Sequence, residues 1–483
     1  MKLAEYAAYD ASGLADLVAK GEVSPKELAR TALAAISAVN GDLNAVIEIY
    51  DDQIDDLDEA SLGHGPFRGV PFLIKDVFGH LKGRKIEFGS RLCEGMIGDV
   101  ETNFARLVKA SGLNILGRTN TPEYSLSSTT ENLLYGNTHN PWKRGHSAGG
   151  STGGGAAAVA SGMVPVAHGS DIGGSIRIPA SWCGGVGLKP SRGRISFGPS
   201  VDEGGWGMAM NFVQTKTLRD TARLLDCLSV PQPGDPFVVA RPERNYESFL
   251  KADVKPLRIA WTAKPLMQEG PVDPEVAAAV QATARALEGM GHQVGEDSFP
   301  FDIDELNSAF LDVWFFGFDL RLEGYATRTG RKIGPETLES VTLELYDYAR
   351  CVDAPRFLAA VTYMNTVRRT IGAFFERYDI WVTPATVQVA PPHGLYGMHR
   401  PDEKAEDHIV AVERPCQYPL PFNVAGAPAL SLPLAMHSSG LPIGVQLGAR
   451  PAEEHLLIAL GARLEEAMPW RDRLPPVHVS TRG

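Results

Sequence analysis

The chain has 483 residues, enough for roughly two to four domains or for one large α/β domain. Hydrophobic residues make up 44% of it and charged residues 22%, which is ordinary globular composition with ample material for a core. A formal charge of −12 without any basic run excludes a typical nucleic-acid-binding surface, so no nucleic-acid partner is expected.

No apolar stretch reaches the roughly 18 residues of a membrane-spanning helix, so no membrane partner is expected either. The first residues, MKLAEYAAYD, carry acids where a signal peptide has an apolar core. The five cysteines are scattered, odd in number and without a CxxC pair. This pattern is typical of free thiols in a reducing cytoplasm, and it predicts a cytoplasmic protein without a disulfide or zinc framework.

Two helices are predicted at the start of the chain, over residues 11–20 and 24–40. The second has a clear beginning, because Ser24 provides an N-cap, Pro25 occupies the first turn and Glu27 completes a capping box. The next predicted elements are a strand over 43–50, an exposed acidic helix over 51–62, a buried strand over 70–74 that ends in Lys75, a helix over 102–110 and a strand over 113–117.

Residues 117–142 form a long polar loop, and loops of that length in a compact chain are often functional. Two glycine-rich loops follow, GGSTGGG at 149–155 and DIGGS at 171–175, separated by an Ala/Val run that predicts a short helix and a strand. Glycine allows sharp turns that expose backbone N–H groups, and each loop presents one serine. The pair predicts a site that needs a nucleophile and stabilises an oxyanion.

A further loop is expected over residues 198–212, where Trp206 and Met208 are available to wall a pocket. Beyond it the predicted elements are strands over 257–261 and 292–294 around a helix over 274–291, a mostly helical aromatic-rich segment over 300–348, a strand over 379–385, a β pair over 429–434 and 442–448, and a helix over 453–467. Strands and helices that alternate without repeats favour one large α/β domain.

Several short motifs match known functional patterns but lack the neighbouring sequence features that those patterns require. Gly149 to Gly153 fits GxSxG, but the elbow of α/β-hydrolases needs an apolar strand before it, and here NPWKRGHSA precedes. Gly153 to Ala158 fits the dinucleotide pattern GxGxxA and lacks the same strand. Ser248 to Lys251 fits SxxK without its partner motifs, and the histidines show no metal-binding spacing. What remains is a hydrolase that uses serine and lysine, with no metal and no cofactor.

The chain resembles the amidase signature family. The resemblance is carried by GVPFLIKD, GGSTGGGAAAVASG, DIGGSIRIPASWCGGVGLKP and PFNVAGAPALSLPL with GLPIGVQLG, and it covers most of the chain. TLRDTA, PGDP and AMPWRDRLP are similar to bacterial amidases that hydrolyse linear and cyclic oligoamides. The family implies one α/β domain over 1–483 with a mixed twisted sheet covered by helices on both faces. Its expected parts are a helical 1–65, a signature core over 66–230 with the catalytic loops, and a smaller α/β part over 231–483.

The resemblance also implies residue roles. Ser175 matches the acylated nucleophile, Ser151 the bridging serine that the family holds in a cis peptide, and Lys75 the general base. The remaining implied positions are the oxyanion-hole N–H groups of Ile172, Gly173, Gly174 and Ser175, the bracing pair Asp171 and Arg177, Thr152 in place of a second serine, and the substrate-facing Ser125 and Ser170.

The implied chemistry is physically consistent. A free lysine has a pKa of about 10.4 and is a poor base at neutral pH unless burial lowers that pKa. Lys75 follows an apolar strand, a setting that favours the neutral amine. Ser151 would then pass a proton from Ser175 to Lys75 and return it to the leaving nitrogen, and water would cleave the acyl-enzyme by the reverse route.

The expected reaction is hydrolysis of a small carboxamide to an acid and an amine or ammonia. A carbamate (urethane) or aryl-anilide hydrolase is the close alternative, since both use the same three residues. An amidase-like subunit of a tRNA-dependent amidotransferase is less favoured, because the acidic chain has no evident tRNA-binding extension. A catalytically dead binding protein is disfavoured because all three reactive residues are present. The sequence leaves the substrate and the oligomeric state open, with a homodimer as one option.

Overall fold

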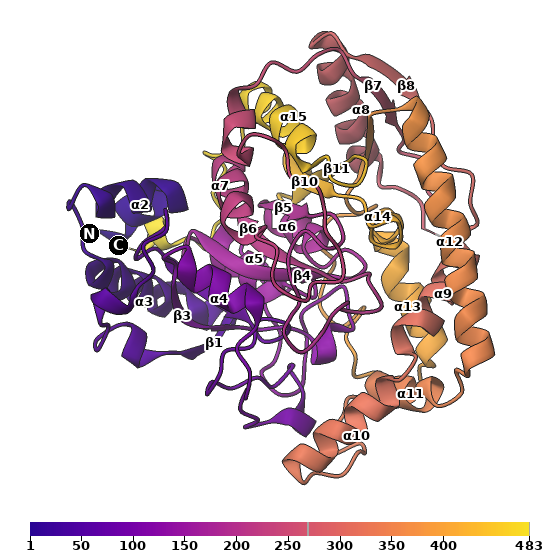
Figure 1. The fold of residues 1–483 in the computed structure, drawn as a ribbon, viewed down its shortest axis with the longest axis horizontal. Helices are drawn as coiled ribbons and strands as arrows, with labels where there is room; N and C mark the ends of the chain where they lie inside the picture. Colours follow the sequence, from indigo (N-terminus) through magenta and orange to yellow (C-terminus); the bar gives the residue numbers. More distant parts are fainter. Residues whose placement is uncertain (268–269, 483) are drawn as a thin grey trace.

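The computed structural model describes residues 1–267 and 270–482 (Figure 1). Over these residues one mixed sheet of eleven strands runs in the order β1-β3-β2-β4-β6-β5-β10-β11-β9-β7-β8. The strands are β1 (Val46–Ile49), β2 (Pro71–Lys75), β3 (Asn114–Thr119), β4 (Val166–Asp171), β5 (Val186–Lys189), β6 (Met210–Thr215), β7 (Arg258–Trp261), β8 (Gln293–Glu296), β9 (Ile380–Pro384), β10 (Ala429–Met436) and β11 (Pro442–Gly448).

The sheet joins all three expected parts of the chain. β1, from the N-terminal part, pairs with β3, and β5, from the core part, pairs antiparallel with β10, from the C-terminal part. The strands β3, β2 and β4 are parallel neighbours, and every residue of the three is buried. Parallel strands buried on both faces need continuous apolar runs, which explains why the PFLI segment of β2 has no alternation. The carboxyl ends of β2 and β4 therefore meet at one edge.

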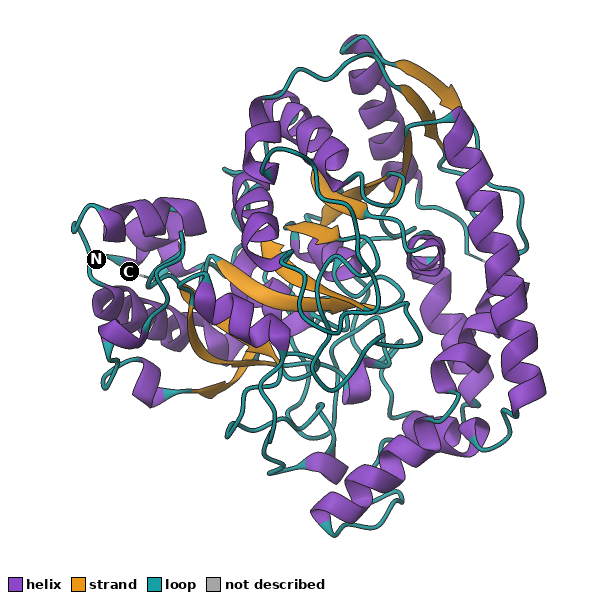
Figure 2. Ribbon diagram, viewed as in Figure 1, coloured by secondary structure: helices purple, strands orange, loops and turns teal. Residues whose placement is uncertain are grey.

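Helices surround the sheet (Figure 2). They are α1 (Leu3–Ala8), α2 (Ala11–Ala19), α3 (Pro25–Leu43), α4 (Asn103–Ala110), α5 (Gly153–Ala160), α6 (Arg177–Cys183), α7 (Leu218–Leu228), α8 (Pro274–Gly289), α9 (Ile303–Phe315), α10 (Phe318–Thr329), α11 (Ser340–Ala349), α12 (Ala354–Arg377), α13 (Ala405–Glu413), α14 (Leu420–Ala425) and α15 (Glu454–Ala467).

Strand register shows that helices cover both faces. On β11, Gly444 lies against Ser181 of α6, with so little space that an added Cβ would come within 2.4 Å of its hydroxyl. Leu447 is an odd number of residues away and so points to the other face. It pairs with Leu430 of β10, which packs against Gly461 of α15. The single α/β domain with a mixed sheet and helices on two faces is therefore confirmed.

Local sequence signals explain most helix boundaries. Ser24 caps α3 by accepting from the N–H of Glu27 at 3.1 Å, as predicted. The helix continues past the expected end at residue 40 to Leu43, and Asn44 stops it in the left-handed conformation, with φ of 52°. Thr102 caps α4 in the same way, through the N–H of Ala105.

The predicted acidic helix over 51–62 is wrong: the segment contains only short 3₁₀ turns, at Asp51–Gln53 and Glu59–Ser61. Asp51 and Asp55, like Asp52 and Asp56, would stand four residues apart on a helix, where like charges repel. The start of β6 was likewise expected to be loop, and α12 was not predicted. The sequence does contain a helical pattern for α12, because the buried residues of this helix recur at spacings of three and four: Ala360, Met364, Val367, Ile371 and Phe374.

Candidate active site

Lys75 is the last residue of β2, at the edge where β2 and β4 end together. Its side chain is 0% exposed, surrounded by the parallel strands and the two glycine-rich loops. The next residue, Asp76, turns away and accepts hydrogen bonds from Arg118 and from the N–H groups of Glu87 and Gly89. The two consecutive residues therefore lie in different environments. Asp76 forms an ion pair with Arg118, whereas Lys75 has no charged group in direct contact among the described residues.

Three hydroxyls surround the amine of Lys75. Nζ lies 2.7 Å from Ser151 Oγ, 2.9 Å from Ser170 Oγ and 3.1 Å from Thr152 Oγ1. A neutral amine has two N–H donors and one lone pair. The Thr152 hydroxyl donates to the Ser170 carbonyl at 3.3 Å, so its oxygen accepts from Nζ. With Ser170 as the second acceptor, the lone pair of Nζ is left for the hydroxyl proton of Ser151.

Burial lowers the pKa of Lys75 well below its ordinary value, and the more distant Asp171 only partly opposes that effect. The physical cause is desolvation, which penalises the charged form of an amine that has no carboxylate in contact. The site therefore favours a neutral lysine, the form that can accept a proton.

The first glycine loop brings Ser151 to this lysine. Gly149 has φ of 84°, and an added Cβ there would lie 2.6 Å from Cα of Pro179 in α6, so the two loops pack without room for a side chain. Gly150 is equally confined, since a Cβ would lie 2.5 Å from the carbonyl oxygen of Ser127. The Gly150–Ser151 peptide is cis, as the resemblance implied. Ser151 is 1% exposed.

The second loop is fixed by a buried ion pair between Asp171 and Arg177. All five N–H donors of the guanidinium are used: two bind Asp171, and the others bind the Pro419 carbonyl, Gln446 and Asn423. Burial opposes ionisation of Asp171, but Arg177 and the hydrogen bonds lower its pKa to about 2. Gln446 and Asn423 come from β11 and α14, so the C-terminal part of the chain holds the loop in place.

Ser175 lies between Gly174 and the start of α6 and is half-buried. Its hydroxyl makes no hydrogen bond to any residue within 1–267 and 270–482, so the expected contact with Ser151 stays a prediction. The N–H of Gly174 donates to Asp171 Oδ1 at 2.9 Å, which engages one of the four expected oxyanion donors inside the loop. The N–H groups of Ile172, Gly173 and Ser175 have no partner among the described residues.

Ser170 and Ser125, the two serines expected to face substrate, are both buried and in contact with other residues of the site. Ser170 is 2% exposed and contacts Lys75. Ser125 is 6% exposed and lies 3.1 Å from Thr121 Oγ1, which donates to the carbonyl of Ser151 at 2.9 Å. Ser170 therefore contacts the lysine directly and Ser125 is connected to Ser151 through Thr121, while a contact of either serine with substrate stays a prediction.

The loop around Trp206 matches the expected wall more closely. Trp206 is 48% exposed and packs against Phe316 and Phe357. Met208 is buried in the same apolar cluster as Ile172. The loop containing Trp206 and Met208 therefore runs beside the Ile172–Ser175 segment and presents an aromatic ring to solvent there.

His168 was not predicted from the sequence, which gives no signal for it. Its Nδ1 accepts from the backbone N–H of Lys75 at 3.3 Å, and its Nε2 faces Asn211 Oδ1 at 3.3 Å. Burial lowers the pKa of His168 to about 3, and Lys75 adds to that effect. A neutral imidazole therefore holds the backbone of the lysine in place.

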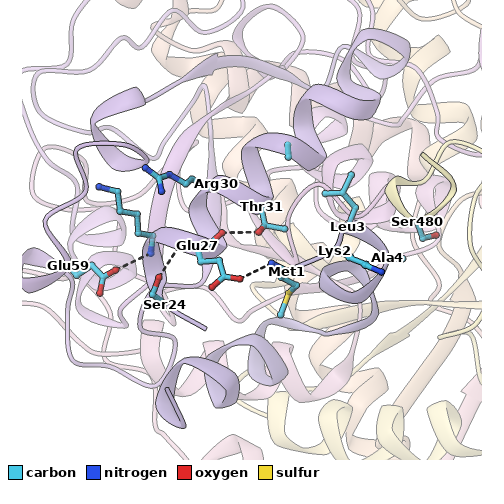
Figure 3. Close-up of a pocket in the computed structure, with 12 residues that line it drawn as sticks. Met1, Lys2, Leu3, Ala4, Ser24, Glu27, Arg30, Thr31, Glu59 and Ser480 are labelled. Atoms are coloured by element: carbon cyan, nitrogen blue, oxygen red, sulfur yellow. Dashed lines mark hydrogen bonds and ion pairs between the residues drawn. The ribbon is translucent and has the colours of Figure 1, made fainter. Parts of the chain in front are cut away.

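A cavity of about 1020 Å³ lies well outside this site, between the N-terminal helices (Figure 3). Its lining comes from α1, α3 and two short turns, and an ion pair within the lining joins the Met1 amino group to Glu27.

Of the helices in the described part of the chain, none combines the length and hydropathy needed to span a bilayer. Residues 1–267 and 270–482 hold no group of three or more His, Cys, Asp and Glu side chains suited to a metal ion.

Comparison with known proteins agrees with this geometry. The family model described as Amidase matches residues 27–458. A 6-aminohexanoate-cyclic-dimer hydrolase of Pseudomonas sp. (strain NK87) is 36% identical, with 96% of each chain covered, and an acylamidase of Rhodococcus erythropolis is 33% identical over the same shares. A solved structure of 6-aminohexanoate cyclic dimer hydrolase superimposes with a TM-score of 0.92 at 34% identity, covering 98% of this chain and 99% of the other. The chain therefore belongs to the amidase signature family, whose members hydrolyse carbon–nitrogen bonds.

Proposed function

We propose that this amidase hydrolyses a small carboxamide through an acyl-enzyme intermediate on Ser175. The observation that carries the proposal is the 2.7 Å contact between Lys75 Nζ and Ser151 Oγ in a site where burial lowers the pKa of the lysine well below its ordinary value. A serine hydroxyl is a weak nucleophile and needs a base, and this pair supplies one without histidine.

The proton follows a defined route. Ser175 Oγ attacks the substrate carbonyl as its proton passes to Ser151 Oγ, and the Ser151 proton passes to Lys75 Nζ. The same route in reverse delivers a proton to the leaving nitrogen, because an amine anion is a very poor leaving group. A water molecule then attacks the acyl ester of Ser175 and loses its proton through Ser151 to Lys75. The relay returns that proton to Ser175 Oγ as the ester bond breaks, and the acid is released.

The developing oxyanion is stabilised by backbone donors. The N–H groups of Ile172, Gly173 and Ser175 have no partner within residues 1–267 and 270–482, and we assign the oxyanion hole to these three. The N–H of Gly174 is assigned to the support of the loop, because it already donates to Asp171. Donors held in place before the reaction lower the barrier without reorganisation.

The substrate class we propose is a linear or cyclic amide with an aliphatic acyl chain. The names of the two relatives support it, since one acts on a cyclic dimer of 6-aminohexanoate and the other is an acylamidase. Phe310, whose ring lies beside Gly173, and Trp206, in the loop that contacts Ile172, are apolar side chains suited to methylene groups. We further place the enzyme in the cytoplasm, because all five of its cysteines are unpaired.

The test uses a fluorophosphonate probe followed by peptide mapping. We expect one labelled serine, Ser175, and no label in Ser175→Ala. Purified enzyme should hydrolyse aliphatic amides without a partner protein, and a parallel screen of anilides and carbamates with product mass spectrometry ranks the alternative substrates. Label on Ser151 in an active Ser175→Ala variant would reverse the assignment of the nucleophile.

A further inference from the structure

The last residue of α13, Glu413, reaches the second glycine loop. Its Oε1 lies 3.7 Å from the position that a Cβ would occupy on Gly173, and Cζ of Phe310 lies 3.6 Å from the same position. Gly173 is two residues before Ser175. Glu413 is 8% exposed, and its Oε2 has no hydrogen-bond partner among the described residues. A carboxyl group therefore lies beside the oxyanion loop with hydrogen-bonding capacity left unused.

No nearby cation in the described chain compensates this carboxyl. The charge of Arg177 acts on this carboxyl, but all five N–H donors of Arg177 are bound to other groups. The amine of Lys75 is held by its three hydroxyls. Arg414, the next residue along the chain, lines a separate cavity with Met267 and Asp304. The opposite charges of Asp171 and Arg177 thus compensate each other, and the carboxyl group of Glu413 is present in addition to that ion pair.

The surroundings decide the charge of this acid. Burial raises the pKa of Glu413 to about 8; Arg177 opposes the shift and Asp171 adds to it. At neutral pH the carboxyl of Glu413 is therefore mostly protonated, and in that form it both donates and accepts hydrogen bonds. A buried polar group without a partner is costly, so such groups normally have one in the working state of a protein. Substrate is the partner that this position can receive.

We propose that Glu413 determines specificity by binding an N–H-bearing group in the acyl portion of the substrate. The inference rests on the proposed function, because it takes the space beside Gly173 and Phe310 as the acyl pocket. Both an amide N–H and a terminal ammonium group present the required donor. An amide is bound by the protonated carboxyl, and an ammonium group is bound by the carboxylate after Glu413 releases its proton.

The experiment compares three 4-nitroanilides of equal chain length: hexanoyl, 6-acetamidohexanoyl and 6-aminohexanoyl. The wild-type enzyme should prefer the two N–H-bearing substrates over hexanoyl by roughly tenfold or more in kcat/KM. Glu413→Met, which keeps the side-chain length, should remove that preference and leave hexanoyl hydrolysis within about threefold of wild type. Glu413→Gln separates the two donors: it should retain the acetamido preference and lose the amino preference. Glu406→Gln, an exposed acid of the same helix, is the matched control and should change none of the rates.

Equal loss on all three substrates in Glu413→Met would overturn the inference, since it would show a merely structural role. Absence of any preference in the wild-type enzyme would overturn it as well, without recourse to a variant.

A second readout uses hexyl and 6-aminohexyl fluorophosphonates, with the rate of covalent labelling followed by intact-protein mass spectrometry. If the anilides are not hydrolysed but Glu413→Met abolishes faster labelling by the amino probe, the proposed function fails while the role of Glu413 stands. If the anilides are hydrolysed and neither assay shows selectivity, the role of Glu413 fails alone.

Discussion

Two buried basic residues, Lys75 and Arg177, belong to the catalytic loops and the strand beside them, and both are 0% exposed. Arg177 binds a carboxylate and fills all five of its donor positions, whereas Lys75 contacts only hydroxyls. The first arrangement holds a full charge and fixes a loop. The second has no carboxylate in contact with the amine, and burial lowers the pKa of Lys75 well below its ordinary value, which favours the neutral form. The type of partner, and not the degree of burial, separates the structural cation from the base.

The largest expected effect comes from removing the base. Lys75→Met should lower kcat by about a thousandfold or more with a smaller change in KM, because general-base assistance is lost and the methionine cannot accept a proton. Lys189→Met is a matched control: Lys189 is also 0% exposed with a pKa well below the ordinary value because of burial, but its Nζ donates to the Pro190 carbonyl. Equal losses of kcat in the two folded variants would show that burial of a lysine, and not its serine partner, matters.

The second effect is on stability and addresses the other cation. Asp171→Asn leaves the charge of Arg177 buried without a carboxylate, so the free energy of unfolding should fall by about 3–5 kcal/mol in urea titrations. Asp304→Asn, an exposed acid in the first turn of α9, should change it little. An Asp171→Asn variant as stable as wild type would mean that the polar neighbours alone hold the loop.

The Asp171 pair also has a pH signature of known sign. Its folded pKa of about 2 is below the unfolded value of about 3.9, so the unfolded chain binds more protons in between. The stabilisation is therefore complete above about pH 4 and is lost as the pH falls toward the folded pKa. Asp171→Asn should lack this portion of the acid dependence, which denaturation at several pH values would detect.

The smallest expected effect is a shift of the pH–rate profile. Protonation of Lys75 removes the base, so kcat/KM should fall as the pH drops through a lysine pKa well below the usual one. Ser170→Ala removes one acceptor from Nζ and should lower kcat/KM by about tenfold while moving that limb to lower pH. A limb centred near about 10.4 would indicate an ordinary solvated lysine and contradict the neutral base.

Local patterns were sufficient for many elements of this chain. The Ser24 cap, the strand that ends at Lys75 and the two glycine loops follow from residues close in sequence, because caps, buried strands and tight turns depend on local chemistry. The acidic segment 51–62 failed as a helix because repulsion between like charges four residues apart was not weighed. The start of β6 failed because its pairing partners, β4 and β5, are supplied by tertiary contacts.

The sequence by itself determined which residues are available for chemistry: a lysine after an apolar strand, and two serines in loops that only glycine can build. The tertiary structure decided which role each residue has in the site. Ser170 lies on the lysine because β4 runs beside β2, the N–H of Gly174 is engaged because Asp171 folds back on its own loop, and Glu413 reaches Gly173 from 240 residues away. Protonation states depend on burial and on the partner groups in contact. Both are properties of packing between distant segments, so the three hydroxyl partners of Lys75 and the buried carboxyl of Glu413 were visible only in the folded chain.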